Sequence, residues 1–514
     1  MSSKLNLILL ECSDEIFFYF ENDIRALYKF LFVNRIWCRI IVPILWKHPF
    51  SSTSKGREIK TLTSLLNPEE RLEIINDSDY ITLQPEEFPS TIFNYASYIQ
   101  DYNTSELFQS IESWYKENFH YENHHRFEIK IIQLNYIYKV FTKLIMRNSK
   151  VIKNLSISPI YSINCDDIPE ICIFVKFQPG FMNIKKLEIQ TSFITSNVYH
   201  LLVSLKDNSH NIQDLIIYGK INKQVKDVDL IIQLIKAQHK LSFVHLKFDL
   251  NLTPILETLS SNHSNSLTSL KLTRISKQFS FSSIQRFKNL QNLCMLCCGG
   301  LDQNVFDNFS QADFNLKSLE LDCVDKRVLM FILKNLTNEN LKKISFYHNT
   351  SLEVIQDLFI RCPNISILKI QRNQYQEGFI SSLSVLESSL THLSILFNSV
   401  FNSSHVYQIY DELCNISLPK LTFIDIYMPK STIPLESYLK MTSSPLRTII
   451  FHDSNKISME YVDILLKFSK RRTLKIVGIS LRSDEKRFKT FAKITEGYFQ
   501  IVTAWEMDCW EIDC

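Results

Sequence analysis

The sequence is poor in several features that mark other protein classes. It contains 8 glycines in 514 residues, too few for glycine-marked architectures such as β-propellers. Its 57 Lys and Arg residues nearly balance its 54 Asp and Glu residues, which leaves a net charge of +3. Such a balance gives no electrostatic reason to expect nucleic acid or an anionic membrane as partner. No apolar run approaches the roughly 18 residues that a membrane span needs.

Cysteine use and the first residues point to the cell interior. The 12 cysteines are scattered, without the dense spacing of a disulfide framework. The apolar stretch 5–10 is followed at once by Glu11, Asp14 and Glu15 and offers no small-residue cleavage site. We therefore expect a soluble intracellular protein, cytoplasmic or nuclear, in a reducing compartment.

Motifs that would mark catalysis are also missing. There is no Gly-rich phosphate loop, serine nucleophile elbow or HExxH sequence. Cys294, Cys297 and Cys298 invite a zinc site, but two further ligands at the usual spacing do not follow. His124 and His125 are adjacent, and adjacent side chains on a helix point apart. Buried cysteine and a polar surface stretch explain the two clusters better, so we expect no enzyme, cofactor or metal.

What the sequence does contain is an internal repeat. The pattern apolar-x-x-apolar-x-apolar occurs at 152–157 as Ile-Lys-Asn-Leu-Ser-Ile. The same hexad recurs with first positions at Ile184, Ile212, Leu241, Leu267, Leu290, Leu316, Leu341, Ile365, Leu390, Leu421 and Leu446. A weaker thirteenth unit starts at Arg471 and keeps only Leu474 and Ile476. The average spacing of about 27 residues lies in the range of leucine-rich repeats, which this array resembles.

The periodicity predicts the structure of each repeat. Because side chains alternate along a strand, positions four and six of each hexad should face a shared core, and positions three, five and seven the opposite side. In segment 351–360, Leu352, Ile355 and Phe359 have the spacing of an inward helix face. One strand and one helix per repeat predict an α/β leucine-rich-repeat solenoid, a horseshoe with a parallel concave sheet and outer helices.

Two local features strengthen the resemblance. The segment Cys362-Pro363-Asn364-Ile365 is similar to the boundary sequence of cysteine-containing leucine-rich repeats. In that fold the ninth position usually holds a buried Cys or Asn that satisfies backbone groups. Here the matching residues are Cys298, Asn349, Asn373 and Asn398, whereas other repeats place Lys220, Asp249 or Pro429 there.

The first 46 residues follow another pattern, with three short apolar faces at helical spacing. The segments Glu15-Ile16-Phe17-Phe18-Tyr19-Phe20, Val33-Asn34-Arg35-Ile36-Trp37 and Leu45-Trp46 resemble the F-box. That family has the pattern Leu-Pro-x-Glu-Ile, then Val-Cys-Lys/Arg-x-Trp, then Leu-Trp. The opening proline is missing here, with Ile8, Leu9 or Leu10 nearest to its place.

This resemblance implies a substrate-recognition subunit of an SCF-type ubiquitin ligase. In that family the F-box binds a Skp-type adaptor, and through it a cullin scaffold, while the repeats bind a protein substrate. The adaptor-binding positions that it implies are Leu9, Leu10, Ile16, Phe17, Phe20, Val33, Trp37, Leu45 and Trp46. The alternative is a protein-binding scaffold or inhibitor with no role in ubiquitination.

The predicted organisation places substrate binding on the concave face. We expect an F-box-like module at 1–50, a mostly helical connector and N-terminal cap at 51–150, about 12–13 repeats at 151–480 and a C-terminal cap at 481–514. Large aromatic and charged side chains are the usual anchors of protein interfaces. Those at outward positions are Tyr218, Phe243, His245, Lys247, Glu320, Asp322, Lys343, Tyr347, Lys369, Asp425 and Tyr427.

Overall fold

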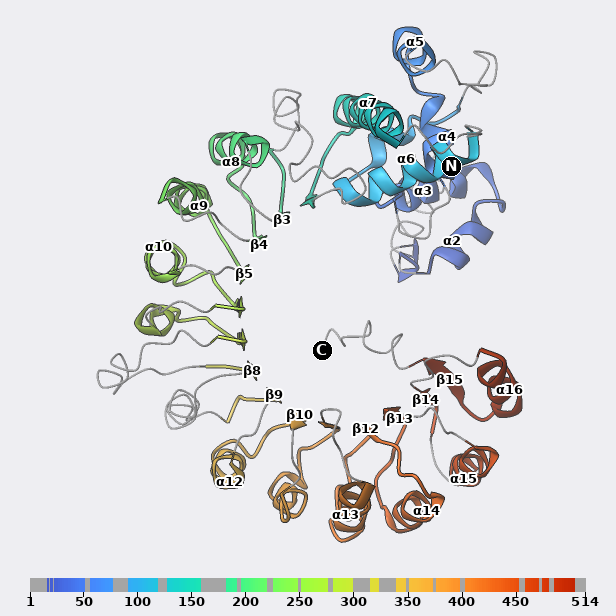
Figure 1. Cartoon of the computed structure of the whole chain (residues 1–514), viewed down its shortest axis with the longest axis vertical. Helices are drawn as coiled ribbons and strands as arrows, with labels where there is room; N and C mark the ends of the chain where they lie inside the picture. Colours follow the sequence, from blue (N-terminus) through green and yellow to red (C-terminus); the bar gives the residue numbers. More distant parts are fainter. Residues whose placement is uncertain are drawn as a thin grey trace, which may run out of the picture. The chain divides into compact units, whose positions relative to one another are not determined.

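The chain forms two compact units in the computed structural model (Figure 1). The N-terminal unit comprises residues 1–250 and 254–266, and the C-terminal unit comprises 251–253 and 267–514. The structure describes residues 16–17, 19–21, 23–50, 56–76, 91–118, 127–158, 182–191, 196–219, 225–247, 251–275, 281–298, 315–322, 339–347, 351–372, 376–397, 403–452, 458–470, 474–479 and 485–503.

The N-terminal unit begins with helices. They are α2 (Ile24–Phe30), α3 (Arg35–Leu45), α4 (Arg57–Thr63), α5 (Pro68–Asn76), the 3₁₀ turn η2 (Tyr95–Tyr98), α6 (Thr104–Asn118) and α7 (Phe127–Asn148). Side chains cap the first two: the Ala26 amide donates to Asp23 at 3.0 Å, and the Trp37 amide donates to Asn34 at 2.8 Å. These caps fix where α2 and α3 begin.

Parallel strands and return helices complete this unit. The strands, each hydrogen-bonded to the next in the sequence, are β1 (Asp101–Asn103), β2 (Asn154–Ile157), β3 (Lys186–Thr191), β4 (Asp214–Gly219) and β5 (Phe243–Lys247). The returns are α8 (Ser196–Asn208), α9 (Val225–Ala237) and α10 (Thr253–Asn262). All three helices lie on the same side of β3, β4 and β5 (Figure 1), and none of the three covers the other side of these strands.

The C-terminal unit continues the pattern. Its parallel strands, again in sequence order, are β6 (Ser269–Thr273), β7 (Asn292–Leu296), β8 (Ser318–Asp322), β9 (Lys343–Tyr347), β10 (Ile367–Arg372), β11 (His392–Phe397), β12 (Phe423–Tyr427), β13 (Thr448–His452), β14 (Ile476–Ile479) and β15 (Gln500–Thr503). The returns described as helices are α12 (Leu352–Arg361), α13 (Ser403–Cys414), α14 (Thr432–Met441), α15 (Met459–Ser469) and α16 (Glu485–Thr495). Two returns are the 3₁₀ turns η5 (Phe281–Arg286) and η7 (Ser381–Leu386).

The core is built from the predicted hexad positions. At positions four and six of the twelve full hexads, no side chain is more than 3% exposed. The pairing register aligns these positions from strand to strand, as in Leu270↔Leu293 and Leu293↔Leu319. Stacked repeats of this kind bury a continuous apolar column that no single repeat could bury alone. The predicted α/β leucine-rich-repeat class is therefore confirmed.

The ninth-position prediction is confirmed where the structure describes it. Cys298 is 1% exposed, and its Sγ lies 3.5 Å from the carbonyl oxygens of Leu272 and Leu296. The three asparagines at this position lie outside the described residues. In this repeat the buried thiol therefore lies against backbone carbonyl groups, one of which, that of Leu296, also accepts from the Arg274 amide at 2.7 Å.

The register of the thirteenth unit was predicted wrongly. Val477 pairs with Ile449 and Ile479 with Phe451, so Val477 and Ile479 occupy positions four and six and are fully buried. Leu474, expected at position four, takes position one. The hexad starts at Leu474, three residues later than predicted. The error arose because Leu474-Lys475-Ile476 has the apolar-x-apolar pattern of positions four to six of a hexad.

The expectation of one helix per repeat also needs correction. The hexads starting at Leu267 and Leu290 are 23 residues apart, and their return contains the six-residue η5 rather than an α-helix. The return between β10 and β11 likewise contains η7. The 23-residue spacing leaves few residues for α-helical turns, and the tighter 3₁₀ turn spans that return instead. Length does not explain η7, because hexads 24 and 25 residues apart enclose α12 and α14.

Candidate functional site

The N-terminal helical segment, which was predicted to be an F-box-like module and is called the module below, has a small aromatic core. Phe17, Leu27 and Ile41 are buried there, and Trp37 packs against them. The Trp37 ring lies 5.1 Å from Phe17 and 5.5 Å from Phe30, both edge to face. Because Phe17 is only 1% exposed, it is unavailable to a partner, and its expected place in an adaptor contact needs correction. Trp37 likewise contributes mainly to packing.

The other residues expected to bind the adaptor are spread over surface and core. Ile16 and Val33 are exposed by 53% and 55%. Phe20 and Leu45 pack at the edge of the core, and the Trp46 ring lies 4.5 Å from that of Tyr95. Leu9 and Leu10 lie outside the described residues.

The module exposes more large apolar side chains than the motif suggested, and we call this set of residues the module face. It consists of large apolar side chains that are 46–87% exposed, namely Ile16, Tyr19, Ile24, Tyr28, Phe32, Val33 and Ile36. Tyr19, Ile24, Tyr28, Phe32 and Ile36 were not among the predicted adaptor-binding positions, because helical periodicity alone does not say which apolar stripe a small module buries. Soluble proteins rarely expose apolar side chains in such density unless a partner covers them.

On the strand side of the N-terminal unit, three predicted residues lie together. The Tyr218 hydroxyl is 3.0 Å from His245 Nδ1, and the two rings meet edge to face at 4.8 Å. Lys247 Nζ lies 5.7 Å from the centre of the Tyr218 ring. Burial, and next the charge of Glu188, raise the pKa of Tyr218. Phe243, on the same strand as His245, is half-buried.

The C-terminal unit holds a second cluster around Asp425. Ser394 Oγ donates to Asp425 Oδ2 at 2.7 Å, and His452 Nε2 lies 2.6 Å from Asp425 Oδ1. Asp425 was expected to be an open binding residue, yet it is 9% exposed, because its neighbours on β11 and β13 cover it. The seventh position of the hexad at Leu446 would have identified His452, which the sequence analysis missed.

The remaining predicted residues of the C-terminal unit do not gather into one site. Asp322 Oδ2 accepts a bond from the Cys297 thiol at 3.3 Å. Tyr427 lies 5.9 Å from the His452 ring. Glu320, Lys343 and Lys369 are half-buried on β8, β9 and β10, and the Tyr347 side chain lies outside the described residues.

The module joins the repeats much as one repeat joins the next. Between repeats, the backbone carbonyl at position two of one hexad accepts hydrogen bonds from two successive amides of the following repeat. The Lys153 carbonyl, for example, accepts from the Lys185 and Lys186 amides at 2.7 and 3.1 Å. The Lys47 carbonyl, outside any hexad, accepts from Gln100 and Asp101 at 3.1 and 3.2 Å. This contact brings the segment after α3 beside β1.

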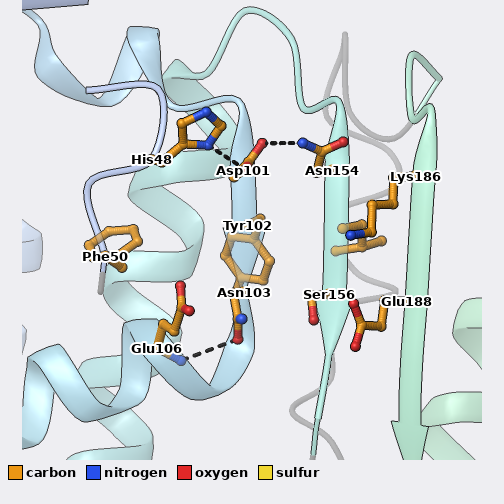
Figure 2. A pocket seen from close by; sticks show the side chains of 11 residues that line it. His48, Phe50, Asp101, Tyr102, Asn103, Glu106, Asn154, Ser156, Lys186 and Glu188 are labelled. Atoms are coloured by element: carbon orange, nitrogen blue, oxygen red, sulfur yellow. Dashed lines mark hydrogen bonds and ion pairs between the residues drawn. The ribbon is translucent and has the colours of Figure 1, made fainter. Parts of the chain in front are cut away.

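That junction surrounds a pocket, which we call the β1–β3 pocket (Figure 2). Its lining comes from His48 and Phe50 after α3, residues 101–103 of β1, Glu106 in the first turn of α6, residues 154–156 of β2, and Lys186 with Glu188 on β3. Its volume is about 200 Å³. The sequence analysis missed it because β1 was not predicted.

A hydrogen-bonded row runs along one side of this pocket. His48 Nδ1 pairs with Asp101, whose second oxygen accepts from Asn154 Nδ2 at 2.7 Å (Figure 2). The bond to Asp101 raises the pKa of His48, although burial opposes this. Burial, and next the Asp101 charge, raise the pKa of Glu106. Asn103 Oδ1 accepts from the Ser105 and Glu106 amides at 3.0 and 3.2 Å, so β1 and α6 hold the Glu106 backbone in place.

Two searches of the described part of the chain gave negative results. No group of three or more His, Cys, Asp or Glu side chains is arranged to hold a metal ion there. No helix in those ranges is both long enough and apolar enough to cross a membrane.

Comparison with known proteins identifies no family. No family model and no curated protein matches the sequence. Among solved structures, an internalin from Listeria monocytogenes is similar, with a TM-score of 0.32 and 15% identity, over 65% of this chain and 78% of that chain. The leucine-rich-repeat class rests on the buried hexads and the strand order, not on this similarity.

Proposed function

We propose that this chain is a protein-binding scaffold whose partner lies against the strand side of the repeats. The observation that supports this most is the cluster of Tyr218, His245 and Lys247, where rings and a cation meet on adjacent strands. Such side chains are the common anchors of protein interfaces. Adjacent strands lie about 4.8 Å apart, so one bound segment can contact several repeats.

Replacing Tyr218 and Lys247 together by alanine should reduce partner recovery at least about tenfold, because both changes remove anchor area without touching the buried hexads. The full-length chain serves as bait, and its specifically enriched proteins are quantified by mass spectrometry. Lys236→Ala, an exposed change on α9, is the matched control and should leave recovery unchanged. Equal recovery by the double variant would contradict binding at this cluster.

We further propose a more specific function, which the F-box resemblance implies. In it, the module face binds a Skp-type adaptor, and the chain recruits a substrate to an SCF-type ubiquitin ligase. The seven exposed apolar side chains of the module face support it. Covering such area releases roughly 25 cal/mol per Å². A scaffold or inhibitor without a role in ubiquitination remains the alternative, because the opening proline of the motif is missing.

Adaptor binding by purified proteins separates these two functions. The intact chain should form a stoichiometric complex with a Skp-type adaptor, measured by calorimetry. Phe32→Asp with Val33→Asp should weaken it at least about 30-fold, because each carboxylate would lose its hydration in an apolar contact. Lys60→Asp on α4, an exposed site outside the module face, should have no effect. A folded chain that binds no adaptor would leave only the scaffold function.

A further inference from the structure

The β1–β3 pocket has an excess of negative charge. Three acidic side chains line it, from Asp101, Glu106 and Glu188, against the Lys186 ammonium and the His48 imidazole. Asp101 uses both oxygens, on His48 and Asn154, and Glu188 accepts a bond from Gln190 at 2.6 Å. Among the described residues, the Glu106 carboxylate has neither a hydrogen-bond nor an ion-pair partner, and it points into the pocket (Figure 2). The pocket therefore favours a cation that Glu106 can bind.

The size and walls of the pocket narrow the choice of cation. About 200 Å³ is below the roughly 300–1,000 Å³ of small-molecule sites, but it admits one long side chain. Phe50 contributes an apolar ring to the lining. Tyr102 contributes no hydroxyl, because that group is bonded inside the protein to Tyr138 at 2.6 Å and Thr142 at 2.8 Å. The Ser156 hydroxyl, which can accept a hydrogen bond as well as donate one, also lines the pocket.

We propose that the β1–β3 pocket receives the guanidinium of one arginine side chain of the bound protein. The inference rests on the proposed protein-binding function and names a residue type that the partner must carry. A guanidinium is planar, always charged and rich in N–H donors, so it can bond to Glu106 and Ser156 while its flat face lies on the Phe50 ring. An anion would meet the three carboxylates, and a lysine ammonium offers fewer donors and no flat face.

Blocked amino acids test the pocket directly. Nα-acetyl-arginine methylamide is titrated into the full-length chain, and binding is followed by saturation-transfer NMR. We expect a saturable signal that is at least about tenfold weaker with Nα-acetyl-citrulline methylamide, which has nearly the same shape and no charge. Equal signals from the two probes would overturn the proposal, because shape alone would then explain the binding.

Two glutamine substitutions on α6 test whether the arginine probe binds at Glu106. Glu106→Gln keeps the size of the side chain and should raise the dissociation constant of the arginine probe about tenfold, since a charge-assisted bond is lost. Glu117→Gln, an exposed change on α6, should not alter it. Both variants should unfold at the wild-type temperature.

The arginine proposal and the scaffold proposal fail in different ways. An unchanged constant in Glu106→Gln would overturn the pocket assignment while leaving partner recovery through Tyr218 and Lys247 intact. Equal partner recovery by the Tyr218 and Lys247 double variant, with normal binding of the arginine probe, would instead overturn the scaffold proposal and leave the pocket assignment intact.

Discussion

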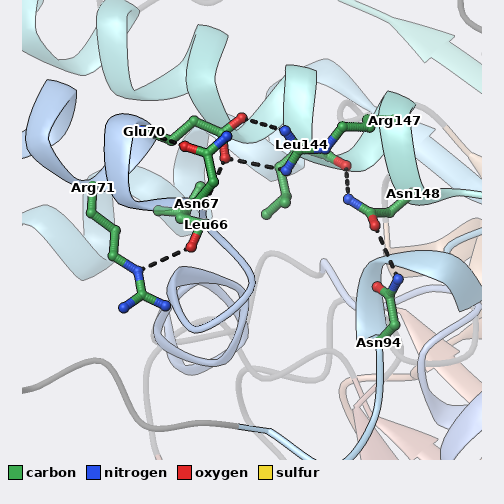
Figure 3. Close-up of polar contacts among 8 residues, drawn as sticks. All are labelled: Leu66, Asn67, Glu70, Arg71, Asn94, Leu144, Arg147 and Asn148. Atoms are coloured by element: carbon green, nitrogen blue, oxygen red, sulfur yellow. Dashed lines mark hydrogen bonds and ion pairs between the residues drawn. The ribbon is translucent and has the colours of Figure 1, made fainter.

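Arg147→Ala should lower the free energy of unfolding by about 3 kcal/mol, because it leaves a buried carboxylate without its counter-charge. Glu70 is 2% exposed, and both its oxygens accept bonds from Arg147, at 2.7 and 3.2 Å (Figure 3). Since 36% of the Arg147 side chain is exposed, water can reach the vacated space. We therefore expect a loss of stability at the low end of the range that is usual when a buried ion pair loses one partner. Urea unfolding of the intact chain measures the change.

Glu70 also closes a capping box, which fixes it in place. Its carboxylate accepts from the Asn67 amide at 3.0 Å, and its own amide donates to Asn67 Oδ1 at 2.7 Å. The two bonds hold the start of α5, so Glu70 cannot turn towards solvent without breaking the cap. The pair therefore ties α5 to α7.

Two variants separate this buried pair from a general effect of changing α7. Lys143→Ala, exposed and one turn earlier on the same helix, should change stability by less than about 0.5 kcal/mol. Arg147→Met combined with Glu70→Leu should recover most of the loss, because apolar pairs of similar volume often replace buried ion pairs. An Arg147→Ala protein as stable as Lys143→Ala would show that the pair contributes little.

The hexads predicted most of the repeat strands because a single physical demand, burial at positions four and six, shapes every repeat. Where position six holds a polar residue, the pattern misses the strand. β1 belongs to the unrecognised hexad 99–104, whose sixth residue is Thr104, and β15 belongs to 498–503, whose sixth residue is Thr503. Thr104 is fully buried because its hydroxyl bonds to the Ser158 backbone at 3.0 and 2.9 Å.

The site was harder to predict, because it depends on contacts between residues far apart in the sequence. The alternation of side chains along a strand predicted that Tyr218 and His245 face away from the core. It did not predict that their side chains would bond to each other. His48 comes from outside the array, and the backbone contact of Lys47 with β1 brings it to Asp101. No local pattern contains that contact. In the module, the sequence predicted the apolar faces but could not tell Phe17, which is buried, from Phe32, which is exposed.

Leu293→Ala should cost about 3 kcal/mol of unfolding free energy, since it removes a buried side chain from the apolar column of the C-terminal unit. Leu293 is 1% exposed and pairs in register with Leu270 and Leu319, both fully buried. Asn292→Ala, at the adjacent position of β7, is the matched control. Because neighbouring side chains on a strand face opposite sides, and Asn292 is exposed, we expect a change below about 0.5 kcal/mol.

The strands that Leu293→Ala destabilises distinguish a repeat stack from a single globular core. In a stack, each repeat contacts its neighbours only, so a cavity at Leu293 should act mainly on β6, β7 and β8. Amide hydrogen exchange should therefore lose protection most strongly in those three strands, and least in β13 and β14. Uniform loss of protection across the C-terminal unit would instead mean that its strands unfold as one cooperative block. Binding on one repeat could then change the stability of distant repeats without any contact between them.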